Sequence, residues 1–205
     1  MSKLFTIGYS GLNEAEFARH LVNNDINVVC DVRSTPYSIY KPAFSRRPFR
    51  EFLNASAIKY IFLGEQLGAR PKDRSCYVDG QATYERIAST TLFNEGLDRL
   101  RAGVERLNLA LVCSERDPIE CHRAILVCRN MPDLRSSISH IHTDGRVESQ
   151  EDFEERLVGY HNTAPPPLLR RPGDWKDAVS LAYQRQGEAI AYRERGFESS
   201  QESTE

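Results

Sequence analysis

The chain has 205 residues, of which 40% are hydrophobic and 27% are charged, and its formal net charge is -2. This length suits one sizeable core and not two, and the small net charge excludes a global attraction to nucleic acid or anionic membranes. No apolar stretch approaches the roughly 20 residues that span a bilayer, and the five cysteines lie mostly in apolar stretches, which suits a reducing compartment. We therefore expect a cytoplasmic protein with no membrane partner.

The first part of the chain predicts a strand, a helix and a second strand. Residues 3–7 are expected to form the first strand, and the turn after them leads into a helix over 14–23 that begins with a capping box of Asn13 and Glu16. Its core-facing residues are expected to be Phe17, Leu21 and Val22. The apolar run 26–32 predicts the second strand. A strand–helix–strand start of this kind favours a parallel sheet.

The later elements continue this pattern. We expect an ordered loop over 39–50, a short helix over 49–54, a strand over 59–63 and a loop over 64–73. Two helices are expected within 84–106, the second with Leu92, Leu97, Leu100 and Val104 on its apolar face. Strands over 109–113 and 137–142 and a helix over 152–160 follow. The predicted fold class is α/β, a mostly parallel, Rossmann-like three-layer sheet with flanking helices, plus a C-terminal helical extension.

The C-terminal part of the sequence differs in composition from the rest. Residues 164–167, Ala-Pro-Pro-Pro, predict a stiff linker, which precedes a helix over about 175–194. The polar, acidic end, 198–205, is expected to be disordered. We therefore divide the chain into an α/β domain, 1–163, and a segment of linker, short helix and acidic tail, 164–205.

The segment 109–128 carries the chemistry-bearing residues. Its buried strand is followed by Asp117, Pro118 and Glu120, which together have the form of a helix N-cap, a first helical proline and a capping-box glutamate. Cys121 and His122 are then expected in or just after the first helical turn. In open α/β sheets, ligands bind at the carboxyl ends of strands beside such helix starts. The sequence therefore predicts a site here.

Four motifs together resemble those of the DUF488 family, a domain of unknown function. They are IGYS at 7–10, DVRSTPYS at 31–38, GEQLGARP at 64–71 and CSERDPIECHR at 113–123. The likeness extends over about residues 4–155 and implies an α/β domain. The positions that match the family pattern are Arg33, Pro36, Ser38, Phe44, Glu115, Cys121, His122 and Arg123.

We predict from these residues an enzyme acting on a phosphorylated, nucleotide or nucleic-acid-derived substrate. Glu115 is the candidate general acid or base, and Cys121 with His122 lines the pocket or supplies a nucleophile. Cys121 has an alternative role, since it could pack inward with Ile125 and Cys128. The catalytic candidates are thus Glu115, Cys121 and His122.

The predicted substrate-binding residues are Arg33, Ser38 and Arg123. Guanidinium groups hold phosphate or carboxylate through two parallel hydrogen bonds. The competing interpretation is structural, because Arg123 could instead neutralise Asp31 or Glu115 within the domain. A phosphate-bearing small molecule or nucleic acid is the expected partner.

Two alternatives of different classes stay open. Arg46, Arg47 and Arg50 lie among aromatic residues in the stretch 37–50, a mixture that would suit a non-catalytic nucleic-acid-binding module. The other alternative is a metal-dependent hydrolase or redox protein, in which Cys113, Cys121 and His122 would bind the metal together with Asp31 or Glu115. The spacing lacks the close C-x-x-C pairing of structural zinc sites, so the sequence assigns no metal ligand and identifies no cofactor.

Overall fold

The computed structural model describes residues 2–166 and 171–194. Its main sheet has six strands in the order β3-β2-β6-β1-β7-β8, and all neighbouring pairs are parallel except β7 with β8. The strands are β1 (Leu4–Gly8), β2 (Val28–Asp31), β3 (Lys59–Phe62), β6 (Leu109–Cys113), β7 (Ile138–Ile141) and β8 (Val147–Ser149). A two-stranded ribbon, β4 (Tyr77–Val78) and β5 (Gln81–Ala82), lies apart from this sheet. The predicted α/β fold with a mostly parallel sheet is confirmed.

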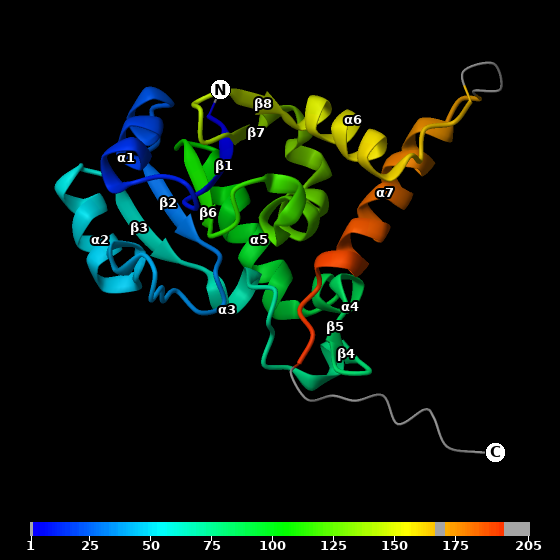
Figure 1. Ribbon diagram of the computed structural model, residues 1–205, viewed down its shortest axis with the longest axis horizontal. Helices are drawn as coiled ribbons and strands as arrows, with labels where there is room; N and C mark the ends of the chain where they lie inside the picture. The colour runs from blue at the N-terminus through cyan, green and yellow to red at the C-terminus, as the bar shows by residue number, and fades with distance from the viewer. Residues whose placement is uncertain (1, 167–170, 195–205) are drawn as a thin grey trace.

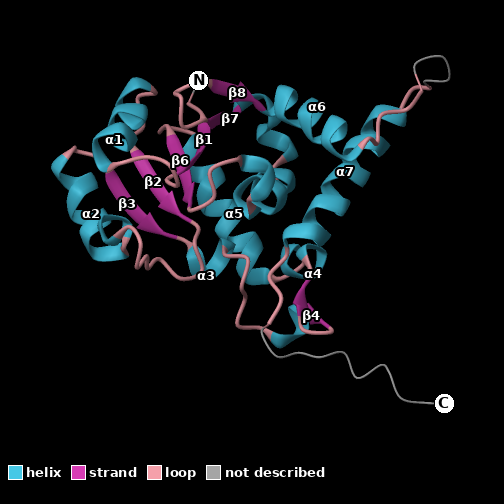
Figure 2. Cartoon of the chain, viewed as in Figure 1, coloured by secondary structure: helices cyan, strands magenta, loops and turns pink. Residues whose placement is uncertain are grey.

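Helices cover both faces of the sheet (Figures 1 and 2). The longer ones are α1 (Glu14–Asn23), α2 (Arg46–Ala55), α5 (Thr91–Val104), α6 (Gln150–His161) and α7 (Asp174–Ile190), and the short ones are α3 (Gly64–Leu67) and α4 (Tyr84–Ala88). None of the helices in the described ranges is long and apolar enough to cross a membrane.

The strand side chains alternate between two apolar layers, as the period of a strand requires. Phe5 and Ile7 of β1 pack on the α1 and α2 side against an aromatic cluster in which the ring of Phe17 meets those of Phe44 and Phe49. Leu4 of β1 packs on the opposite side with residues of α5 and of the segment after β6. Because helices bury both faces, the central strands β1 and β6 are buried throughout and mostly apolar.

The C-terminal helix α7 packs on α6 and on the segment after β6 (Figure 1). Tyr183 of α7 is buried there, and its hydroxyl lies 2.7 Å from Gln150 Nε2. The predicted C-terminal helix is present, although the division of the chain at 163/164 stays a prediction. Pro167 and the predicted acidic tail, 198–205, lie outside the described residues.

Several local predictions are wrong. Helix α2 begins at Arg46, within the first expected loop, and α3 occupies Gly64–Leu67, the start of the second expected loop. Val22 and Leu92 are 60% and 48% exposed, so neither belongs to the core; Val22 follows buried Leu21 by about 100° around the helix axis. The segment after β6 begins with one 3-10 turn, Pro118–Glu120, in place of an α-helix. Asp117 caps that turn through Ile119 N as expected, but Cys121 has extended φ and ψ angles and a π-helix, Arg123–Val127, comes after it.

Candidate functional site

The candidate site lies at the carboxyl ends of β1, β2 and β6, the central strands of the sheet. A cleft of about 560 Å³ opens there. The residues that follow those strands line it, and α4 and the end of α7 close it from the other side. The lining comprises Tyr9, Arg33, Ser34, Thr35, Tyr37, Ala69, Arg70, Tyr84, Cys113, Ser114, Glu115, Glu120, His122, Ile190 and Tyr192. This is the position at which open α/β sheets bind ligands.

Cys113, Glu115, Cys121 and His122 form one compact cluster, which we call the Cys–Glu–His cluster. One donor atom from each side chain lies within 4.8 Å of the others. The two thiol sulfurs lie 2.9 Å and 3.0 Å from the same oxygen, Glu115 Oε2. The sulfurs also lie 3.7 Å and 3.9 Å from His122 Nδ1. The structure therefore brings together the predicted catalytic residues and adds Cys113.

The 3-10 turn and the extended Cys121 explain how these side chains meet. The turn reverses the chain after β6, so that Cys121 and His122 return to the end of that strand. His122 Nε2 then lies 3.0 Å from the carbonyl oxygen of Val32, at the end of the neighbouring β2. Since that carbonyl only accepts, it fixes a proton on Nε2 and leaves Nδ1 to face the two sulfurs.

The environment perturbs every titratable group of the cluster. Burial raises the pKa of Cys121, but the neighbouring Cys113 thiol, the charge of Arg123 and His122 outweigh burial and lower that pKa. The neighbouring Cys121 and burial raise the pKa of Cys113. Burial also raises the pKa of Glu115, but both thiols outweigh it and lower the pKa to about 2. Groups shifted in opposite directions within one cleft are typical of functional sites.

Arg123 is fully buried behind the cluster and does not line the cleft. Its guanidinium donates to the carbonyl oxygens of Glu115 and Arg116, at 2.8 Å and 3.2 Å, and to Thr6 Oγ1. No carboxylate in the described part of the chain forms an ion pair with it. Arg123 thus holds the loop that carries Glu115. The predicted contact of Arg123 with substrate stays a prediction.

Gly8 leaves the space for that loop at the end of β1. A Cβ atom at Gly8 would lie 1.8 Å from the carbonyl oxygen of Glu115, the same oxygen that Arg123 binds. No side chain fits at that distance. The backbone of the site therefore requires a glycine at this position of the IGYS motif.

Arg33 lines the cleft and is only 4% exposed. Its Nε and Nη2 donate to Asp31 at 2.8 Å and 2.6 Å, and Tyr60 donates to the same carboxylate. Burial lowers the pKa of Arg33, but Asp31 and Tyr9 outweigh it, so the guanidinium stays charged. The remaining nitrogen, Nη1, is buried and has no hydrogen-bond acceptor among the described residues.

The other predicted binding residues lie outside the cleft. Ser38 accepts a hydrogen bond from Lys41 N and holds its own loop. Arg46, Arg47 and Arg50 are exposed on α2, where Arg46 stacks on the ring of Phe62. Phe44 and Phe49, the phenylalanines of the stretch 37–50, are fully buried and are not free to stack on bases.

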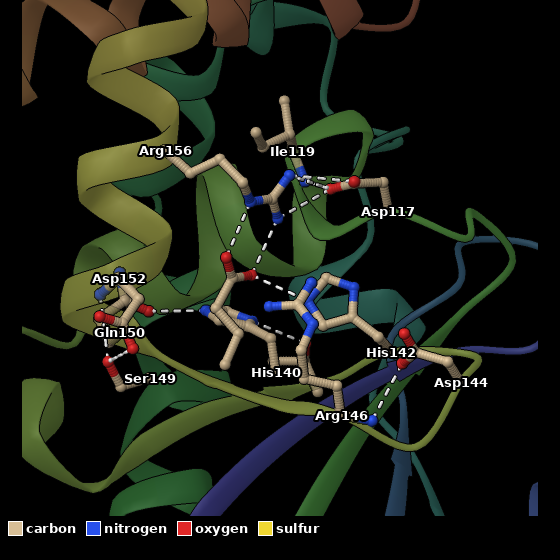
Figure 3. Close-up of polar contacts among 12 residues, drawn as sticks. Asp117, Ile119, His140, His142, Asp144, Arg146, Ser149, Gln150, Asp152 and Arg156 are labelled. Atoms are coloured by element: carbon tan, nitrogen blue, oxygen red, sulfur yellow. Dashed lines mark hydrogen bonds and ion pairs between the residues drawn. The ribbon is translucent and has the colours of Figure 1, made fainter.

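A second polar network lies beside the cluster, at the edge of the sheet (Figure 3). Glu148, only 3% exposed, accepts from Arg156 at 2.7 Å and lies 2.9 Å from His142 Nε2. Arg156 also reaches Asp117 at 3.0 Å, and so ties α6 to the turn that precedes Cys121. His140 is 1% exposed and bonded to Thr6 and Gln150. Neither histidine belongs to the Cys–Glu–His cluster.

Sequence reasoning missed the side of the cleft formed by Tyr84, Ile190 and Tyr192. These residues come from α4 and from the end of α7, far from the strand ends in sequence. Arg70, within the GEQLGARP motif, also lines the cleft and stacks on the Tyr192 ring at 4.4 Å. No local motif marks Tyr84, Ile190 and Tyr192, because only the packing of distant elements brings them to the site.

Comparison with protein families gives one match. The model of the family described as domain of unknown function DUF488 matches residues 14–129, which include β2, β6 and the whole Cys–Glu–His cluster. Comparisons with curated proteins and with solved structures gave no match. The matched segment is more than half of the chain, and this protein therefore belongs to the DUF488 family.

Proposed function

We propose that this protein is an enzyme that acts on a phosphate-bearing small molecule, with a nucleotide as the preferred class. The substrate binds in the cleft at the strand ends, and the Cys–Glu–His cluster supplies the reactive groups. The observation that carries the proposal is Arg33, whose Nη1 is buried in the wall of that cleft without an acceptor. A buried donor left unpaired costs about 1–3 kcal/mol, and a ligand oxygen would recover that free energy.

The charges of the cleft support a binding position for the anion beside Arg33 and Arg70. The charge of Asp31 neutralises that of Arg33. Arg33 would therefore attract an anion through the N–H donor at Nη1 and not through a net charge. Arg70 adds a cation that forms no ion pair among the described residues. Glu115 and Glu120 also line the cleft, and their charges repel an anion from their own vicinity. A phosphate group therefore fits between Arg33 and Arg70, where guanidinium groups are the donors suited to it.

The aromatic lining favours a nucleotide over a simple phosphate ester. Tyr9, Tyr37, Tyr84 and Tyr192 all line the cleft, and Tyr37 is 68% exposed. A base stacked on an aromatic ring gains about 1–3 kcal/mol. The phosphate would fix the position of the substrate, and the ring contact would favour ligands that carry a base.

Calorimetric titration with nucleoside monophosphates and with the matching nucleosides tests the binding step. We expect binding of the phosphate-bearing ligands and at least about 10-fold weaker binding in Arg33→Lys, since a hydrogen bond to a charged group contributes about 1.5–3 kcal/mol. Arg47→Gln is the matched control, because Arg47 is exposed on α2 and forms its ion pair with Glu51. Equal affinity in wild type and Arg33→Lys would remove Arg33 from the site.

Turnover is tested with the same panel, by following the products by mass spectrometry. Glu115→Gln preserves the shape of the side chain and is expected to abolish turnover while the fold remains. The competing nucleic-acid-binding module predicts a different pattern: binding of oligonucleotides that falls steeply with salt, is lost when Arg46, Arg47 and Arg50 are changed together to Gln, and is insensitive to Glu115→Gln.

A further inference from the structure

The donor atoms of the Cys–Glu–His cluster are arranged as ligands of one metal ion. A tetrahedral zinc ion with bonds of about 2.3 Å to sulfur and about 2.0–2.2 Å to nitrogen or oxygen places its ligand atoms about 3.6 Å apart. His122 Nδ1 already lies 3.7 Å and 3.9 Å from the two sulfurs. Glu115 Oε2, at 2.9 Å and 3.0 Å from them, needs to move outward by roughly half an ångström.

The position of His122 supplies an independent argument. A histidine that ligates a metal almost always donates its other ring N–H to a carbonyl or carboxylate, which fixes both the tautomer and the ring. Here Nε2 lies 3.0 Å from the carbonyl oxygen of Val32, and Nδ1 faces both sulfurs. The imidazole is thus held in the orientation of a metal ligand, with its Nε2 proton directed away from the sulfurs.

The charges in this buried region balance when a divalent ion is bound. Arg123 is fully buried, donates to two carbonyl oxygens and a hydroxyl oxygen, and forms no ion pair with a carboxylate among residues 2–166 and 171–194. Two thiolates and the Glu115 carboxylate exceed the charge of a divalent cation by one, and Arg123 compensates that excess. The region is equally neutral when both thiols keep their protons and no metal is bound. A divalent cation can therefore replace two protons there without leaving an uncompensated buried charge.

We propose that Cys113, Glu115, Cys121 and His122 bind one zinc ion, and that this ion is the reactive centre of the cleft. Two thiolates, an imidazole and a carboxylate form a ligand set that suits zinc. Cys113, Glu115 and His122 line the cleft, whereas Cys121 lies behind them. Glu115 is the most exposed of the four, so its oxygen is the ligand that a substrate can displace. This inference rests on the proposed function only for the role of the ion in the reaction.

The experiment uses the full chain, stripped of metal by a chelator under reducing conditions and then titrated with Zn²⁺ and with Co²⁺. We expect one ion per chain, together with thiolate-to-cobalt charge-transfer absorption and the visible bands of tetrahedral cobalt. Cys113→Ser, Cys121→Ser and His122→Asn are expected to weaken binding by about 100-fold or more. Cys30→Ser and Cys76→Ser are the matched controls, since both thiols are buried outside the cluster.

Three results would overturn the proposal: a reduced wild-type protein that takes up no ion, bound cobalt without charge-transfer absorption, or equal affinity in the control and cluster variants. The wild-type cobalt spectrum keeps the test decisive where a cluster variant fails to fold. Nucleotide titration of the metal-free protein separates this proposal from the proposed function. Metal binding without nucleotide binding refutes only the function, and nucleotide binding that needs Arg33 in a protein that takes up no metal refutes only the zinc site.

Discussion

His140 is expected to make this protein less stable as the pH falls below neutrality. Its ring is 1% exposed on β7, with Nδ1 2.9 Å from Thr6 Oγ1 and Nε2 3.0 Å from Gln150 Oε1. Burial lowers the pKa of His140 to about 3, and the charge of Arg123 contributes to that shift. The folded protein therefore keeps this imidazole neutral in mildly acidic solution.

The magnitude follows from the difference between the two states. The pKa of an exposed histidine is about 6.5, so below that pH the unfolded chain binds a proton that the folded chain excludes. The stability that neutral His140 contributes is complete above about pH 6.5 and is lost as the pH falls toward about 3. Between pH 7 and pH 5 the free energy of unfolding decreases by about 2 kcal/mol from this residue alone.

Urea unfolding of the wild type and of His140→Gln at pH 7, 6 and 5 measures this contribution. Other titrating groups affect both proteins equally, so the difference between the two pH profiles isolates His140. The variant is expected to be less stable at pH 7 and to lose about 2 kcal/mol less than the wild type on going to pH 5. Parallel profiles would refute a buried, neutral His140.

Three further substitutions test the packing around the site. Gly8→Ala places a Cβ 1.8 Å from the carbonyl oxygen of Glu115. It is therefore expected to lower the free energy of unfolding by about 3 kcal/mol or more and to weaken metal binding. A variant with the stability and the metal affinity of the wild type would contradict the close approach of the two backbones. Phe17→Ala empties the aromatic cluster and is expected to cost about 3–5 kcal/mol in urea unfolding, whereas exposed Val22→Ala on the same helix, expected within about 0.5 kcal/mol, is its control. Arg156→Met leaves the buried Glu148 carboxylate without its cation and is expected to cost about 3 kcal/mol at pH 7. That cost is expected to shrink below about pH 4, where Glu148 takes up a proton in the variant; a cost independent of pH would argue against the ion pair.

The sequence was sufficient for the sheet and for the local part of the site. Apolar strands such as 109–113 and the polar motif that follows them are local patterns, and they predicted the parallel sheet and the meeting of Glu115, Cys121 and His122. The geometry of that meeting was not predictable. A capping pattern at Asp117 is compatible with a 3-10 turn as well as with an α-helix, and the extended conformation of Cys121 then decides where its thiol points.

The remaining walls of the cleft depend on contacts between distant parts of the chain. Asp31 was a possible partner of Arg123, but Arg33 binds it instead, two residues away in sequence. His140 lies on β7 and is buried because α6 covers it. Tyr192 reaches the cleft only through the packing of α7. Residue type and spacing carry no signal for such contacts.

The order of the strands has a consequence for how the protein is made. During synthesis β1 and β2 leave the ribosome early, but in the finished sheet β6 lies between them. β1 and β2 therefore do not pair with each other, and each pairs with β6 only after residues 109–113 have been synthesised. That same late strand carries Cys113 and leads directly to Glu115, Cys121 and His122. The pairing of β6 joins β1 to β2 and brings Cys113, Glu115, Cys121 and His122 to the same strand ends, so a nascent chain that ends before β6 lacks the Cys–Glu–His cluster.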